Sequence, residues 1–245
     1  MAITPKLNLF QRVLNRLGQP YGIAPFPMTR ERSVAALQSR RTIFESICEE
    51  NYWGSRESLS GPGSELRSAQ KYRKALIEFI RRNGIRSIFD APCGDLNWMG
   101  EVISATGIHY IGGDISQPVL DVARARHPGL DLRQFDICKD KFPEVQMWHC
   151  RDALFHLSFQ DIWLALENAA QSRVDLVLLT NHRARLLRNL DVNTGGWRCL
   201  DLERPPFRFP SPIEYLPESL PPAFPRAVGV WPIEAIRHVV ARHRA

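Results

Sequence analysis

The chain has 245 residues, of which 44% are hydrophobic and 24% are charged, a composition typical of a soluble globular protein. This composition excludes a chain that is disordered throughout and a fibrous repeat protein. No apolar run approaches the ~20 residues that a membrane-spanning helix needs. The five cysteines are scattered without zinc-ligand spacing, so we expect no metal site.

The positive charge of the chain is concentrated near its N-terminus. The formal net charge is +6, and residues 1–42 contain seven basic residues and one acidic residue, so the remainder is formally neutral. We interpret this segment as a solvated basic face, with weak contact to an anionic surface such as a membrane or RNA as the alternative. The segment lacks the continuous apolar stretch of a signal peptide, which favours a cytoplasmic protein.

Apolar spacing and capping signals predict three helices before the first strand, over residues 7–17, 31–50 and 65–83. A proline-containing connector at 22–27 follows the first helix. A loop at 60–64 precedes the third helix and ends in Ser64, a good N-cap residue. We therefore divide the chain into an N-terminal helical extension or lid (1–60) and a main domain (61–245).

From residue 86 onward, predicted strands and helices alternate. The strands cover 86–90, 109–115, 130–135, 145–150 and 174–180, and the helices cover 97–105, 116–126 and 158–170. Such alternation predicts a parallel sheet covered by helices. Prolines become frequent after residue 181, and two terminal strands are predicted near 197–202 and 227–231.

Acidic residues lie at or beside the ends of three successive predicted strands, namely Asp90, Asp114 and Asp136, and the fourth strand leads into Cys150-Arg151-Asp152. In an open α/β sheet, ligands bind beyond the carboxyl ends of the strands, so we expect these side chains to converge. Asp114 suits the hydroxyls of a ribose, Asp136 an exocyclic amine such as that of adenine, and Asp90 a cationic amine. The pattern predicts a site for a positively charged nucleoside.

The loop after the first strand argues against a phosphate-binding site. Gly94 lets the backbone pass close to a ligand, but the surrounding sequence is P-C-G-D-L-N. A dinucleotide site prefers G-x-G-x-x-G with a free helix N-terminus for the pyrophosphate. A nicotinamide-dependent oxidoreductase is therefore disfavoured, and a Walker loop is absent as well.

Four segments of the chain resemble class I S-adenosylmethionine-dependent methyltransferases. They are I-F-D-A-P-C-G-D-L-N-W-M (88–99), Y-I-G-G-D-I (110–115), F-D-I (135–137) and C-R-D-A-L-F-H-L (150–157). The chain resembles in particular a bacterial branch with D-x-P-C-G-D-x-N-W-M in the first loop. That branch also has S-G-x-G-S upstream, here residues 60–64, and G-G-W-R after the fifth strand, here residues 195–198.

The resemblance implies a doubly wound α/β fold with a mostly parallel seven-stranded sheet, whose last strand is antiparallel. It implies S-adenosyl-L-methionine as cofactor, with Asp114 at the ribose and Asp136 with Ile137 at the adenine. Near the methionine part it places Asp90, Cys93 and Gly94. The further residues expected to bind cofactor are Asp95, Trp98, Ile115 and Arg151. The chain departs from the commoner G-x-G-x-G first loop, because Pro92 and Leu96 replace the outer glycines.

Three residues after the fourth strand are the candidate catalytic residues, Arg151, Asp152 and His156. His156 is a natural general base near neutral pH, with a packed core histidine as the alternative. Arg151 could anchor an anionic group of the acceptor or pair with Asp152. The Asn-Pro-Pro-Tyr motif of nucleobase methylation is absent, which weighs against a nucleic acid substrate.

We therefore expect methyl transfer to an oxygen or nitrogen atom of a small or medium-sized acceptor by in-line displacement. The alternative is a non-catalytic Rossmann-like module that its basic N-terminus docks on a membrane or nucleic acid. The sequence contains no signal for an oligomeric state.

Overall fold

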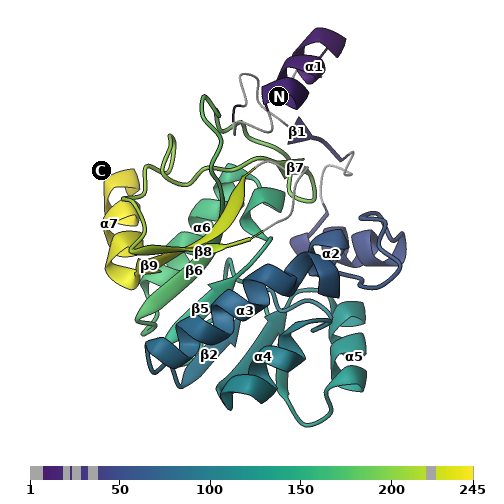
Figure 1. The fold of residues 1–245 in the computed structure, drawn as a ribbon, viewed down its shortest axis with the longest axis vertical. Helices are drawn as coiled ribbons and strands as arrows, with labels where there is room; N and C mark the ends of the chain where they lie inside the picture. Colours follow the sequence, from purple (N-terminus) through teal and green to yellow (C-terminus); the bar gives the residue numbers. More distant parts are fainter. Residues whose placement is uncertain (1–7, 19–22, 24–28, 33–37, 219–224, 245) are drawn as a thin grey trace.

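The computed structural model describes the chain except for residues 1–7, 19–22, 24–28, 33–37, 219–224 and 245 (Figure 1). Its centre is a seven-stranded sheet with the strand order β4-β3-β2-β5-β6-β9-β8. In chain order the strands are β2 (Ser87–Asp90), β3 (His109–Asp114), β4 (Asp131–Gln134), β5 (Met147–Cys150), β6 (Leu176–His182), β8 (Glu214–Pro217) and β9 (Arg226–Pro232). The last strand, β9, is antiparallel to both of its neighbours, whereas the pairs from β4 to β6 are parallel. The predicted fold class is confirmed.

Side chains of each strand alternate between the two faces of the sheet, so the sheet separates two apolar cores. Ile88 and Met147 belong to one core, and their neighbours Phe89 and Trp148 belong to the other. The helices of the first core are α3 (Leu66–Arg82), α4 (Met99–Thr106) and α5 (Gln117–Arg126), and those of the second are α6 (Phe159–Ala170) and α7 (Ile233–Arg244). Both faces of the sheet are therefore covered, which explains the nearly uninterrupted apolar runs of its central strands.

The terminal strand predicted near 197–202 is shorter than expected and lies outside the main sheet. Only β7 (Trp197–Arg198) is a strand, and it pairs with β1 (Thr29–Arg30) in a separate two-stranded sheet. The seventh strand of the main sheet is β8, which the proline-rich pattern of the tail concealed. Pro217 is tolerated there because β8 is an edge strand, where a missing backbone N–H leaves no ladder bond unmade. The helix α7 was not predicted either, although its buried residues have helical spacing.

The predicted helix over 31–50 begins later than expected. The observed helix α2 (Arg40–Glu49) starts after Ser39, whose hydroxyl accepts a hydrogen bond from the N–H of Thr42. Residues 31 and 32 are not helical, because the preceding strand β1 pairs with β7. Residues 33–37 lie outside the described part of the chain, as does most of the connector predicted at 22–27.

The other boundaries near the N-terminus follow local capping. The helix α1 (Leu9–Gly18) ends at Gly18 as predicted, and it stands apart from the sheet at one end of the molecule (Figure 1). Ser64 is not the N-cap of α3, because it belongs to the short helix η2 (Pro62–Ser64). The Glu57 carboxylate instead accepts from the N–H of Leu66, the first residue of α3.

The crossover connections diverge between β2 and β5. The chain leaves β2 toward β3 and β4 on one side, and β5 is followed by β6 on the other. The carboxyl ends of adjacent strands at such a switch point frame a crevice that connections do not cover. None of the helices in the described part of the chain is long and apolar enough to cross a membrane.

Candidate ligand-binding site

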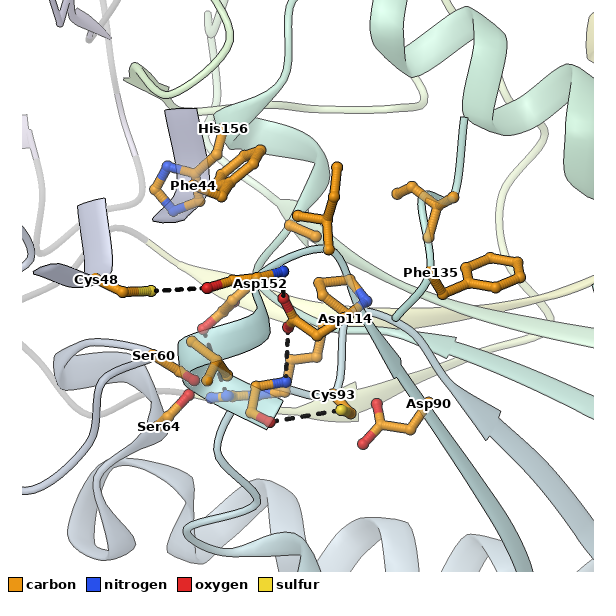
Figure 2. Close-up of a pocket in the computed structure, with 18 of the residues that line it drawn as sticks. Phe44, Cys48, Ser60, Ser64, Asp90, Cys93, Asp114, Phe135, Asp152 and His156 are labelled. Atoms are coloured by element: carbon orange, nitrogen blue, oxygen red, sulfur yellow. Dashed lines mark hydrogen bonds and ion pairs between the residues drawn. The ribbon is translucent and has the colours of Figure 1, made fainter. Parts of the chain in front are cut away.

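A cavity lies at the carboxyl ends of β2, β3 and β5 (Figure 2). The cavity and its mouth hold about 950 Å³ of space between protein atoms, including the open space at the mouth. Eleven of the twelve site residues predicted from the sequence line it. They are Asp90, Cys93, Gly94, Trp98, Asp114, Ile115, Asp136, Ile137, Arg151, Asp152 and His156.

Asp114 at the end of β3 is oriented by backbone donors. Its Oδ2 accepts from the N–H of Gly94 at 3.0 Å, and its Oδ1 accepts from the N–H of Ser116 at 2.9 Å. Burial raises the pKa of Asp114 to about 6, although these two hydrogen bonds act in the opposite direction. Each carboxylate oxygen keeps a second lone pair, so Asp114 can accept two further hydrogen bonds from a ligand.

Asp90 at the end of β2 belongs to a buried hydrogen-bonded chain. Its Oδ2 accepts from the Tyr110 hydroxyl at 2.7 Å, and its Oδ1 lies 2.6 Å from Nδ1 of His149. The Nε2 of His149 lies 3.0 Å from the hydroxyl of Tyr72. Two side chains, a tyrosine hydroxyl and a histidine ring, therefore hold the Asp90 carboxylate from within the protein.

Asp136, which follows β4, is bound by an arginine from the N-terminal extension. Arg40 on α2 donates from Nε and Nη2 to Asp136, the latter at 2.8 Å, and from Nη1 to Asp161 at 2.7 Å. The Oδ1 of Asp136 also accepts from the N–H of Cys138 at 3.0 Å. Arg40 therefore joins α2 to this side of the cavity through two carboxylates.

The charged side chains that line the cavity have a negative sum. Four carboxylates (Asp90, Asp114, Asp136 and Asp152) face two guanidinium groups (Arg40 and Arg151), which leaves a net charge of −2. Within the described ranges, neither Asp90 nor Asp114 has a lysine or arginine at ion-pair distance. Buried carboxylates without a lysine or arginine partner favour a cationic ligand, because such a ligand would offset part of their desolvation cost.

Arg151 and Asp152 form a buried charge cluster with two residues from the C-terminal part of the sheet. Arg151 contacts Asp152 and Glu218, and Arg226 contacts the same two carboxylates. Attraction to both arginines lowers the pKa of Asp152, against burial, which acts to raise it. Because Arg151 also donates to the carbonyl of Gly63 at 3.0 Å, its guanidinium is held in place by protein groups. These contacts favour the ion-pair interpretation of Arg151 over the anchor for an acceptor anion.

His156 in the short helix η3 (Leu154–His156) is fixed by the G-G-W-R segment. Its Nδ1 lies 2.8 Å from the carbonyl oxygen of Gly196, and the N–H of Gly195 donates to the His156 carbonyl at 2.8 Å. A carbonyl only accepts, so Nδ1 carries the proton and Nε2 keeps its lone pair. Burial lowers the pKa of His156 to about 4, so the ring is neutral at pH 7.

Asp95 is the predicted site residue that does not line the cavity. Its Oδ1 accepts from the Ser58 hydroxyl at 2.8 Å, its Oδ2 accepts from the N–H of Leu59 at 3.0 Å, and Arg126 is 2.8 Å away. In return, the N–H of Asp95 donates to the hydroxyl of Ser60 at 3.1 Å. Asp95 therefore holds the 58–60 segment against the first loop, and the S-G-P-G-S motif begins at this junction.

The sequence did not identify the residues that α2 contributes to the cavity. Phe44 and Cys48 line it together with Arg40, and Figure 2 shows Phe44 beside His156. They are 42 or more positions away from Asp90 in the chain, and only tertiary packing brings them there. Trp53, which lies in the predicted N-terminal extension, also lines the cavity, with its ring centroid 5.2 Å from that of His156.

The cysteines of the cavity wall are not activated nucleophiles. Burial raises the pKa of Cys48 to about 11 and that of Cys93 well above its usual value. Both are therefore neutral thiols at pH 7, whereas a thiolate is the reactive form. Across the described residues, no group of histidine, cysteine and carboxylate side chains is arranged to hold a metal ion.

The sheet order and antiparallel last strand define a Rossmann-like fold of the methyltransferase type, and solved structures share it. Magnesium protoporphyrin IX methyltransferase (ChlM) from Synechocystis PCC 6803, crystallised with bound S-adenosylmethionine, is 12% identical with a TM-score of 0.57 over 81% of this chain and 100% of that one. The methyltransferase domain of the bacterial CtHen1-CN is 16% identical with a TM-score of 0.51 over 67% of this chain and 99% of that one.

A third solved structure, DesVI from Streptomyces venezuelae, matches at a TM-score of 0.41 and 15% identity. The match covers 55% of either chain, too little to support an argument. No family model matches the chain, and no curated protein matches it in sequence. At these identities the likeness establishes the fold, and the function has to be argued from the site.

The close packing around Gly94 predicts that an alanine there lowers the free energy of unfolding more than an alanine at Gly107. Gly94 has φ +61, and a Cβ there would lie 2.2 Å from Oγ of Ser60; Gly107 has φ +64 with nothing within 4 Å. We expect Gly107→Ala to cost about 1–2 kcal/mol of unfolding free energy from backbone strain alone. Gly94→Ala should cost at least about 1 kcal/mol more, because it displaces Ser60. Urea denaturation of both variants measures this, and equal losses would contradict the packing.

The tautomer of His156 can be observed directly. In ¹⁵N-labelled protein we expect Nδ1 to be protonated and Nε2 to be bare at neutral pH. The ring should stay neutral as the pH falls to about 5, because burial lowers its pKa to about 4. The His156→Gln variant assigns the signals by their disappearance. A proton on Nε2, or titration near the ordinary histidine pKa of about 6.5, would contradict the geometry.

Proposed function

We propose that the protein binds S-adenosyl-L-methionine and transfers its methyl group to an oxygen or nitrogen atom of a small or medium-sized acceptor. The observation that supports this most is the convergence of Asp90, Asp114, Asp136 and Asp152 on one cavity with a net charge of −2. A nucleoside that carries a sulfonium and an ammonium group, and no phosphate, complements such a wall. The likeness in fold to methyltransferases supports the same proposal.

Different groups of cavity residues fit the different parts of this cofactor. Asp114 has lone pairs left for both ribose hydroxyls, and the apolar side chains of Ile115 and Ile137 suit the two faces of an adenine ring. Asp90, Cys93, Gly94 and Trp98 would surround the methionine part, where the Asp90 carboxylate, which has no lysine or arginine partner among the described residues, favours a cation. Asp136 would accept a hydrogen bond from the adenine amine through an oxygen lone pair that Arg40 does not occupy.

His156 is the proposed general base. When bound, S-adenosyl-L-methionine supplies an electrophilic methyl group whose leaving group is neutral and needs no acid. The enzyme has to align the acceptor and, for a hydroxyl or ammonium acceptor, remove a proton. His156 lines the cavity and keeps a bare Nε2, because the Gly196 carbonyl fixes its tautomer. Its low pKa keeps the ring neutral at pH 7 and Nε2 free to accept a proton, although it also makes His156 a weaker base than an ordinary histidine.

Arg151 and Asp152 are proposed to form the side of the cavity where the acceptor binds. Asp152 accepts from the Thr180 hydroxyl at 3.2 Å, and Arg151 lies over the ring of Trp98 with 5.3 Å to its centroid. Together they place a carboxylate beside the aromatic side of the cavity, where it can accept a hydrogen bond from an acceptor. A non-catalytic module is not favoured, because the strand-end acids and the candidate base share one cavity.

Loss of the proposed ribose contact tests the cofactor site. We expect Asp114→Ala to weaken binding of S-adenosyl-L-methionine and S-adenosylhomocysteine by tenfold or more in calorimetric titrations. One or two hydrogen bonds to a charged group are worth about 1.5–3 kcal/mol. Asp121→Ala, an exposed change on α5, is the matched control and should bind like the unmodified protein. Unchanged affinity in Asp114→Ala would refute the ribose assignment, and no binding by the unmodified protein would refute the function.

Cofactor affinity should also depend on pH through Asp114. Ribose hydroxyls donate to the ionised carboxylate, so a protonated Asp114 must release its proton when the ligand binds. With a pKa of about 6, affinity for S-adenosylhomocysteine should fall as the pH falls below 6, by up to about tenfold per pH unit. Asp114→Asn should flatten this profile. A profile that is level between about pH 5 and 7 in the unmodified protein would contradict it.

A further inference from the structure

The helix α1 presents an exposed apolar face that no other element covers in the described part of the chain. Leu9, Phe10, Val13 and Leu17 are exposed by 79%, 67%, 44% and 64%. They account for half of the large exposed hydrophobic residues among the described ones, within a helix of ten residues. Their spacing places them on one side of the helix, because residues three to four positions apart share a face.

Basic side chains flank this face. Arg12 and Arg16 are exposed, and each lies three positions after a residue of the apolar face, Leu9 and Val13 respectively. Residues 1–30 contain two further basic residues, Lys6 and Arg30, and no acidic residue. An apolar stripe bordered by arginines is the pattern of a helix that lies in the interface of an anionic membrane.

The position of α1 leaves this face accessible. In Figure 1 the helix projects from the end of the molecule that also contains β1 and β7, away from the sheet. Ile23, just after the helix, donates to the carbonyl of Gly18 and forms a bridge with Arg185. Since Arg185 follows β6, α1 is joined to the carboxyl end of the sheet, the same end as the cavity.

We propose that α1 docks the protein on an anionic lipid surface, with Leu9, Phe10, Val13 and Leu17 inserted among the acyl chains and the arginines at the headgroups. Charge complementarity favours this partner over a second copy of the chain. Two α1 helices packed face to face would bring their arginines together without an acidic residue on either helix. Nucleic acid would satisfy the arginines but leave the apolar face in water.

Sedimentation with vesicles tests the docking of the full chain. We expect the protein to bind vesicles of phosphatidylcholine with about a quarter phosphatidylglycerol at least tenfold more tightly than pure phosphatidylcholine, since each basic residue near an anionic surface contributes about fivefold. High salt should abolish this preference. Equal binding to both compositions, or binding to neither, would overturn the proposal.

Paired serine variants test the apolar residues of α1. Phe10→Ser with Leu17→Ser should lower vesicle affinity by tenfold or more, whereas Leu186→Ser with Ile213→Ser removes two equally exposed residues elsewhere and should not. Unchanged thermal unfolding confirms that each variant is folded. If the α1 variant binds vesicles as tightly as the control, the proposal is wrong.

Charge variants and the oligomeric state complete the test. Arg12→Gln with Arg16→Gln should remove the preference for phosphatidylglycerol, while Arg56→Gln with Arg67→Gln, both exposed, should retain it. Light scattering without vesicles gives the oligomeric state. A dimer that the Phe10 and Leu17 changes convert to a monomer, with no vesicle binding, would assign the face to self-association and overturn the proposal.

Discussion

Burying an ionised carboxylate costs several kcal/mol unless donors or cations compensate it, and the cavity wall holds four of them. Asp136 is compensated by Arg40, and Asp152 by two arginines. Asp114 has only backbone N–H donors and Asp90 only neutral or histidine partners. The remaining negative charge is the property of the cavity that supports the proposed cationic nucleoside.

The N-terminal extension contributes residues to the wall of the cavity. Arg40 connects α2 to Asp136 and Asp161, and Asp95 holds the 58–60 segment against the first loop. Both junctions pair a group before residue 61 with a group after it. The boundary at residue 60 therefore marks a change in sequence pattern. We propose that residues 1–60 and 61–245 act as one ligand-binding unit.

Local sequence signals predicted the central architecture because they depend on neighbouring residues only. Apolar runs marked the strands from β2 to β6, and Ser158 marked the start of α6, where its hydroxyl accepts from the N–H of Asp161 as expected. The same signals were misleading for residues 197–202. There the strand partner is Thr29–Arg30, about 170 positions earlier, and a local pattern contains no information about such a partner.

The sequence by itself determined which carboxylates reach the cavity, because each one follows a strand and parallel strands end at the same edge of a sheet. Tertiary structure alone decided what each carboxylate contacts there. Arg40 reached Asp136 across 96 positions, and Asp95 turned away from the cavity toward the 58–60 segment. The physical reason is that strand ends are set by local periodicity, whereas hydrogen-bond partners are set by the packing of distant segments, which the chain order does not encode locally.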